Sequence, residues 1–126
     1  MPRVLPDELP PGPLVRGFSS EGAFVVEGQT YAALLLTPER AAHWVPPALA
    51  ALTLEDVESA LAITPPPEFL LLGTGPGLAF PPRAFIRALE ARGIGVEVMD
   101  SRAAARTWGL LRAEERWIAA ALMPLG

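Results

Sequence analysis

The chain has 126 residues, 51% hydrophobic and 19% charged, with a formal net charge of −4. This length and balance predict a globular domain and argue against a disordered chain. There is no cysteine and only one histidine, which excludes disulfides, thiolate zinc sites and imidazole clusters for a transition metal. All ten basic residues are arginine, so lysine Schiff-base chemistry is excluded as well. We therefore expect no metal and no cofactor.

Charge and hydropathy also limit the partners. The pI is near 4.9 and the arginines are scattered along the chain, whereas nucleic-acid binding needs concentrated positive charge. No apolar run approaches the roughly 18–20 residues that span a bilayer. Met1–Asp7 lacks the apolar stretch of a secretory signal. These observations predict a cytoplasmic protein that binds no nucleic acid and does not insert into a membrane.

The first residues differ from the rest in composition. Residues 1–13 carry five prolines, which remove hydrogen-bond donors and fix φ, so we expect an extended lead-in. Residues 14–124 are then predicted to form a single domain.

The first half of that domain is predicted to form antiparallel β-structure with one helix. Leu14–Phe18 predicts a first strand. Residues 23–26 and 30–36 predict a pair of strands joined around Glu27-Gly28, because glycine supplies the positive φ of a tight hairpin. Residues 43–45 favour a further short strand.

A short helix is predicted after this β-structure. Thr53 is expected to be its N-cap, with Asp56 three residues on as the acid of a capping box. Leu54, Val57 and Leu61 follow at helical spacing and predict its buried face. The prolines of residues 64–67 end this helix.

The second half predicts a βαβαβ unit, an arrangement in which helices connect parallel strands. Its expected elements, in chain order, are a buried strand over 68–72, a helix after Pro81-Pro82, a strand over 94–99, a helix from Asp100 or Ser101, and a buried strand over 117–122. Arg92-Gly93 is expected to close the first helix, because glycine is preferred just after a helix end. The second helix is expected to bury Ala103, Ala104, Thr107, Leu110 and Leu111. The overall class is thus α/β (mixed α+β), with an N-terminal antiparallel hairpin.

The loop Gly73–Gly77 is the first candidate ligand site. It follows a buried strand, and ligands of open α/β sheets collect beyond the C-terminal ends of strands. A dinucleotide fingerprint would need a third glycine where Leu78 stands, so this interpretation is disfavoured. A structural turn is the alternative, because glycine often only marks a turn.

The start of the last helix is the second candidate. Asp100 and Ser101 can simply cap it. Free amide groups at a helix start can also hold an anion, with Arg102 or Arg106 nearby. The predicted ligand-binding residues are Gly73, Thr74, Gly75, Asp100, Ser101 and Arg106. No arrangement of carboxylates, serines and the single His43 matches a catalytic constellation.

Taken in order, these segments resemble the Mth938-like domain family over roughly residues 14–124. The residues that carry the resemblance are Glu68–Gly75, Phe80-Pro81-Pro82, Gly93–Asp100, Ala104–Thr107, Glu115-Arg116 and Ala119–Leu122. The resemblance implies a single three-layer domain with no established catalytic activity. The family includes bacterial and archaeal proteins and a mitochondrial assembly factor of respiratory complex I. Two positions depart from the family pattern: Trp108-Gly109 replaces a usual tyrosine–asparagine pair, and Glu115-Arg116 replaces a glycine–arginine pair.

Two functions follow as hypotheses. The first is a non-enzymatic protein-binding or assembly-type module, which predicts an exposed apolar patch near Phe18, Phe24 or Trp108. The second is a small-molecule or anion-binding protein, conceivably an enzyme, with a site between Gly73–Gly77 and the helix start at Asp100–Arg106. The expected oligomeric state is a monomer or a weak homodimer.

Overall fold

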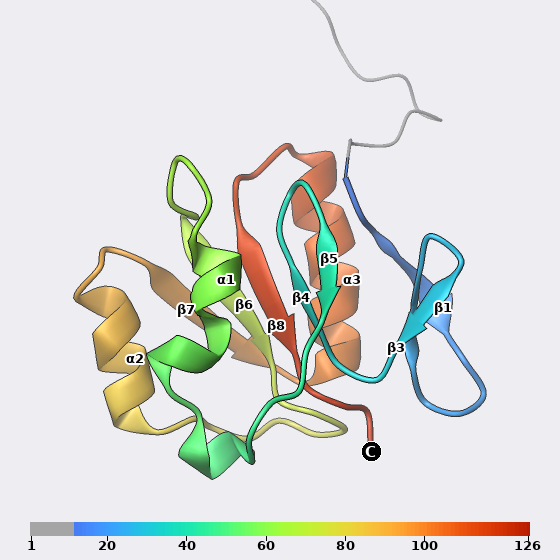
Figure 1. Ribbon diagram of the computed structural model, residues 1–126, viewed down its shortest axis with the longest axis horizontal. Coiled ribbons are helices and arrows are strands. Elements are labelled where there is room, and N and C mark those ends of the chain that lie inside the picture. The colour runs from blue at the N-terminus through green and yellow to red at the C-terminus, as the bar shows by residue number, and fades with distance from the viewer. Residues whose placement is uncertain (1–11) are drawn as a thin grey trace, which may run out of the picture.

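A five-stranded mixed sheet forms the centre of the computed structural model, which describes residues 12–126 (Figure 1). Residues 1–11 of the predicted lead-in lie outside the described residues. The strand order is β5-β4-β8-β6-β7. The strands are β4 Leu34–Leu36, β5 Ala41–His43, β6 Phe69–Gly73, β7 Gly95–Met99 and β8 Ala119–Leu122. Strands β7 and β8 run parallel to β6, and β4 runs antiparallel to both β8 and β5.

A second, antiparallel sheet holds β1 Val15–Phe18, β2 Phe24–Val26 and β3 Gln29–Tyr31. The predicted hairpin turn is confirmed, because Glu27 and Gly28 both take positive φ, at 50° and 80°. This backbone matches the twist of a two-residue hairpin.

The predicted strand over residues 30–36 was wrong as one element. The chain leaves the small sheet after Tyr31 and enters the large sheet at Leu34. All of Leu34–Leu36 is buried, because β4 lies inside the large sheet between β5 and β8. The short strand expected over 43–45 occurs two residues earlier, as β5.

The predicted βαβαβ unit is confirmed. Helix α2 Arg83–Glu90 connects β6 to β7, and helix α3 Ser101–Ala113 connects β7 to β8. Two 3-10 helices, η1 Leu49–Ala51 and η2 Leu54–Val57, precede the short helix α1 Glu58–Leu61. Among residues 12–126, no helix is long and apolar enough to cross a bilayer.

The central sheet buries both faces, which gives three layers. On β6, Leu70 and Leu72 pack with Phe85 and Leu89 of α2 in one core. Leu71, between them, packs with α3 and with the small sheet in a second core. The alternation of side chains along a strand requires this division. Figure 1 shows α1 and α2 on one side of the sheet and α3 on the other.

The caps of two helices were predicted from sequence and are confirmed. The Thr53 amide donates to the Asp56 carboxylate at 2.8 Å, although the first turn there is 3-10. Asp100 is the N-cap of α3 and accepts from the Ala103 amide at 2.9 Å.

The predicted inner face of α3 was wrong in part. Leu110 is 69% exposed, whereas Trp108 is fully buried. The indole of Trp108 donates to the carbonyl of Pro13 at 2.9 Å, and so a large ring and its hydrogen bond fix the orientation of the helix. Arg112 is buried on this face as well. Of the five residues expected inside, only Ala104 is buried; Ala103, Thr107 and Leu111 are half-buried.

Candidate functional site

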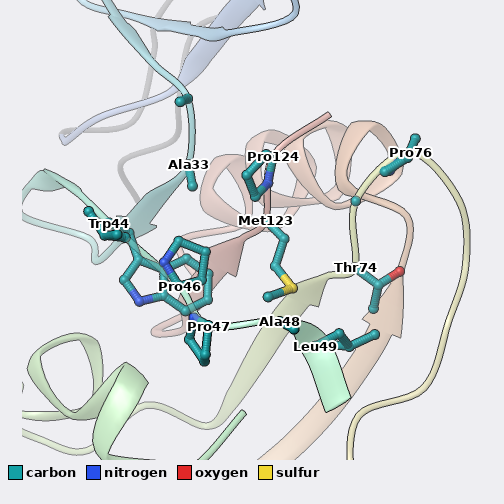
Figure 2. A pocket seen from close by; sticks show the side chains of 13 residues that line it. Ala33, Trp44, Pro46, Pro47, Ala48, Leu49, Thr74, Pro76, Met123 and Pro124 are labelled. Carbon is teal, nitrogen blue, oxygen red and sulfur yellow. The ribbon is translucent and has the colours of Figure 1, made fainter. Parts of the chain in front are cut away.

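An apolar pocket of about 580 Å³ opens beside the C-terminal ends of β6 and β8 (Figure 2). Its walls come from the start of β4, from the segment after β5, from the loop after β6 and from the end of β8. The lining residues are Ala32, Ala33, Trp44, Val45, Pro46, Pro47, Ala48, Leu49, Thr74, Gly75, Pro76, Met123 and Pro124. None of them carries a charge.

The wall after β5 is held by the backbone and indole of Trp44. Its amide donates to the Ala33 carbonyl at 3.2 Å, and its indole donates to the Asp56 carbonyl at 2.9 Å. Pro46 and Pro47 then fix φ and deny the segment two amide donors. Figure 2 shows the Met123 side chain reaching between these prolines and Thr74.

The loop after β6 forms the opposite wall, and Thr74 organises it. The Thr74 hydroxyl donates to the Gly77 carbonyl at 2.7 Å and accepts from the Ala79 amide at 3.1 Å. Beyond this anchor, Leu78 is 61% and Phe80 76% exposed. Across the pocket Val45 is 94% exposed. We call the pocket together with Val45, Leu78 and Phe80 the apolar end of the molecule.

Charged side chains are absent from the chain segments that build the apolar end. Residues 44–54, 69–82 and 117–126 contain none of the chain's arginines, aspartates or glutamates. These three segments meet where β6 and β8 end (Figure 1). An uncharged surface with large exposed apolar side chains is typical of an interaction site.

Five of the six residues predicted to bind a ligand are brought together. The Ser101 hydroxyl accepts from the Gly75 amide at 2.8 Å, and the Ser101 amide donates to the Gly75 carbonyl at 2.8 Å. A Cβ on Gly73 would lie 2.8 Å from the Ser101 hydroxyl, so the loop and the start of α3 touch. Thr74 bonds within its loop, and Asp100 caps α3.

Arg106, the sixth residue, is exposed on α3 and is not among the pocket residues. The neighbouring Arg102 places its guanidinium 4.8 Å from the centre of the Phe18 ring. The backbone and hydroxyl groups of Gly75 and Ser101 are already bonded to each other. Anion binding by these six residues stays a prediction.

Sequence reasoning missed the wall from Trp44 to Leu49. The available signal was the uncharged run of residues 44–54 interrupted by two prolines. The apolar patch was predicted near Phe18, Phe24 or Trp108, and it was wrong for the last two, because both side chains are fully buried. Phe24 and Trp108 fill the core between α3 and the small sheet, and Phe18 is half-buried against it.

Charged contacts lie away from the apolar end. Arg116 donates from two of its nitrogens to the Glu68 carboxylate, with a closest distance of 2.9 Å. These hydrogen bonds lower the pKa of Glu68, and Glu68 in turn raises the pKa of Arg116. Burial lowers the pKa of Arg112. Within residues 12–126, no group of three or more histidines and carboxylates is placed to hold a metal ion.

The three-layer arrangement, with its mixed five-stranded sheet and C-terminal βαβαβ unit, defines the class of fold. The family described as "Protein of unknown function (DUF498/DUF598)" matches residues 16–123. The chain belongs to this family, and its resemblance to the Mth938-like domain is confirmed.

Solved structures of similar proteins share the fold. A crystal structure of a Bordetella parapertussis protein is 33% identical, with a TM-score of 0.80 over 90% of this chain and 97% of that one. A solution structure of a Mth938-like domain from Bordetella pertussis is 29% identical, with a TM-score of 0.76 over 90% of this chain and 87% of that one.

A relative in zebrafish (Danio rerio) bears a functional name. The chain is 29% identical over 122 residues to its NADH dehydrogenase (ubiquinone) 1 alpha subcomplex assembly factor 3, which covers 96% of this chain and 70% of the relative. This chain spans 65% of the mouse protein and 66% of the bovine protein of the same name.

Proposed function

We propose that the chain is a non-enzymatic protein-binding module of the assembly type, and that it engages its partner through the apolar end. The observation that carries this proposal is the uncharged pocket flanked by exposed Val45, Leu78 and Phe80. Keeping these side chains in water costs free energy, and a partner that covers them recovers it. The name of the vertebrate relatives, an assembly factor, supports the same class of function.

The architecture of the pocket defines what the partner presents. An ionised group would lose its hydration there without finding an opposite charge. The partner therefore contributes an apolar side chain, such as leucine or phenylalanine, as the central anchor. Anchors of this kind at the centre of an interface supply most of the binding energy.

Affinity capture from a lysate of the source organism tests the proposal. The baits are the wild-type chain, Val45→Asp and Phe80→Asp; Leu110→Asp is the matched control, because Leu110 is 69% exposed on α3. We expect a stoichiometric protein that both wild type and control capture and that both apolar-end variants lose. Capture of the same proteins by all four baits would refute the proposal. Unfolding curves of each bait verify that the exposed substitutions leave the fold intact.

A second candidate, small-molecule binding, is favoured by the volume of the pocket. About 580 Å³ falls within the range of roughly 300–1,000 Å³ that is usual for small-ligand sites. Thermal-shift measurements with dodecanol, which is uncharged, test an apolar ligand in the pocket. The same assay with phosphate, on wild type and Arg106→Ala, tests the anion site predicted from sequence. A higher melting temperature with dodecanol alone selects the pocket, and one with phosphate that Arg106→Ala abolishes selects the helix start.

A further inference from the structure

We propose that two copies of this chain associate through their apolar ends, with Phe80 of each copy inserted in the pocket of the other. This inference rests on the proposed function, because it uses the same surface and names a second copy as one of its partners. The surface cannot hold two occupants at once. Self-association and binding of another protein therefore compete.

The argument begins with the adjacency of a protruding side chain and a cavity. A two-fold symmetric interface places the same patch on both sides, so the patch must be complementary to itself. The protruding Phe80 and the pocket that receives it must therefore lie on the same patch. Pro76 lines the pocket, and Phe80 follows four residues later. Four residues of extended chain span at most about 14 Å. Phe80 and the pocket therefore belong to one surface patch.

The loop that carries Phe80 is held in place by hydrogen bonds and prolines. Phe80 is 76% exposed, yet its loop is tied down by the two hydrogen bonds of the Thr74 hydroxyl to Gly77 and Ala79. Pro81 and Pro82 follow it and restrict the backbone further. A loop fixed in this way loses little backbone freedom when its exposed side chain binds.

Charge does not oppose a second copy at the apolar end, although it does elsewhere on the surface. Each copy carries a net charge of −4, so two copies repel each other wherever their charged surfaces meet. In a two-fold interface every charge near the axis faces its own equivalent. The segments 44–54, 69–82 and 117–126, which are free of charged side chains, are where two copies can approach without this cost. A strongly basic partner, by contrast, would find no counter-charge on this surface.

The area involved sets the strength of the association. A covered phenylalanine buries roughly 150–250 Å², so Phe80 with the smaller Val45 and Leu78 contributes on the order of 400 Å² per copy. A standard stable interface buries about 800 Å² per partner. The dimer is thus weak, with dissociation in the micromolar to millimolar range.

Sedimentation velocity on the full chain tests the inference. As the concentration rises from micromolar to millimolar, the mean mass of wild type should increase from 13.4 kDa toward twice that value. Phe80→Asp and Val45→Asp should remain at 13.4 kDa, and Leu110→Asp should behave like wild type. A wild type that stays monomeric, or a dimer that both variants retain, overturns the inference.

Disulfide cross-linking tests whether the Phe80 loop of one copy lies at the pocket of the other. Because the chain has no native cysteine, only the introduced cysteines can react. Ala79→Cys chains, which keep Phe80, mixed with Ala48→Cys chains should form a mixed disulfide under mild oxidation, because Ala79 is exposed beside Phe80 and Ala48 is exposed and lines the pocket. Leu110→Cys mixed with Ala48→Cys should not. Equal cross-linking of both mixtures overturns the inference.

Different results would refute the dimer and the protein-binding function. If wild type is monomeric but the apolar-end variants still lose a captured protein, the dimer is refuted and the binding module stands. If Phe80→Asp abolishes the dimer while all baits capture the same proteins, the surface serves self-association and the assembly function is refuted.

Discussion

The hydroxyl of Ser101 accepts a hydrogen bond from the amide of Gly75 and donates one to the carbonyl of Met123, both at 2.8 Å. One buried side chain thus joins the loop after β6, the start of α3 and the end of β8. Gly75 and Met123 line the apolar pocket, whereas Ser101 does not. Ser101 therefore positions the two walls that contain Gly75 and Met123 without lining the pocket itself.

Replacing Ser101 with alanine should lower the free energy of unfolding by about 1–3 kcal/mol, because a buried donor and acceptor lose their partner. Urea denaturation followed by circular dichroism measures the change. Ser20→Ala is the control, since Ser20 is exposed in a turn, and should change stability by less than about 0.5 kcal/mol. Equal stability of the two variants would contradict the role assigned to Ser101.

Gly73→Ala should destabilise the protein by about 1–3 kcal/mol, the usual cost of overpacking. The new Cβ would lie 2.9 Å from the Cα of Ser101 and 3.0 Å from a methyl carbon of Leu122, and the backbone of α3 cannot easily retreat. Gly77→Ala is the matched control in the same loop, because a Cβ there has no atom within 4 Å. The melting temperatures of both variants provide the test. A larger loss at Gly77 than at Gly73 would show that the loop packs differently.

Trp108→Phe should cost about 1–3 kcal/mol, since it keeps much of the ring packing but leaves the buried carbonyl of Pro13 without its hydrogen bond. Leu110→Ala, two residues on, should be nearly neutral because the Leu110 side chain is 69% exposed. Chemical denaturation of both variants checks the orientation of α3. A large loss of stability in Leu110→Ala would instead agree with the sequence-based expectation that Leu110 lies inside.

Stability should depend on pH through Glu68. Its pKa is lowered, first by the hydrogen bonds from Arg116, so the folded state holds the ionised carboxylate more strongly than the unfolded chain does. The resulting stabilisation is complete above the ordinary glutamate pKa of about 4.3 and is lost as the pH falls below it. Glu68→Gln should therefore show a shallower decline in melting temperature over that acid range than wild type. Glu21→Gln, an exposed turn residue, should decline like wild type, and parallel curves for all three would exclude the effect.

The features that sequence predicted well depend on local chemistry. The Glu27-Gly28 turn, the cap at Thr53 and the positive φ of Gly93 after α2, at 76°, each follow from the backbone requirements of one turn. The βαβαβ order follows from apolar runs that alternate with helical spacing. Each of these signals lies within about a dozen residues, and the tertiary structure reinforces it.

The errors arose where long-range packing decided the outcome. Residues 30–36 are uniformly compatible with a strand, and only the pairing of Leu34–Leu36 with β8 shows that they are shared between two sheets. In α3, alanines make the apolar face ambiguous, and the bond from Trp108 to Pro13 spans 95 positions. The pocket unites four segments from residue 32 to residue 124, so no local window contains it.

The position of β8 has a consequence for biosynthesis. Residues 119–122 lie between β4 and β6 and supply the only strand that bonds the first-half strands to the second-half strands within the described sheet. While a ribosome still encloses this segment, β4 and β6 have no shared neighbour, and the backbone edge that each turns toward β8 stays unpaired. The sheet closes only after residue 122 has left the exit tunnel. Until then, the two unpaired edges are sites at which nascent chains can pair with one another.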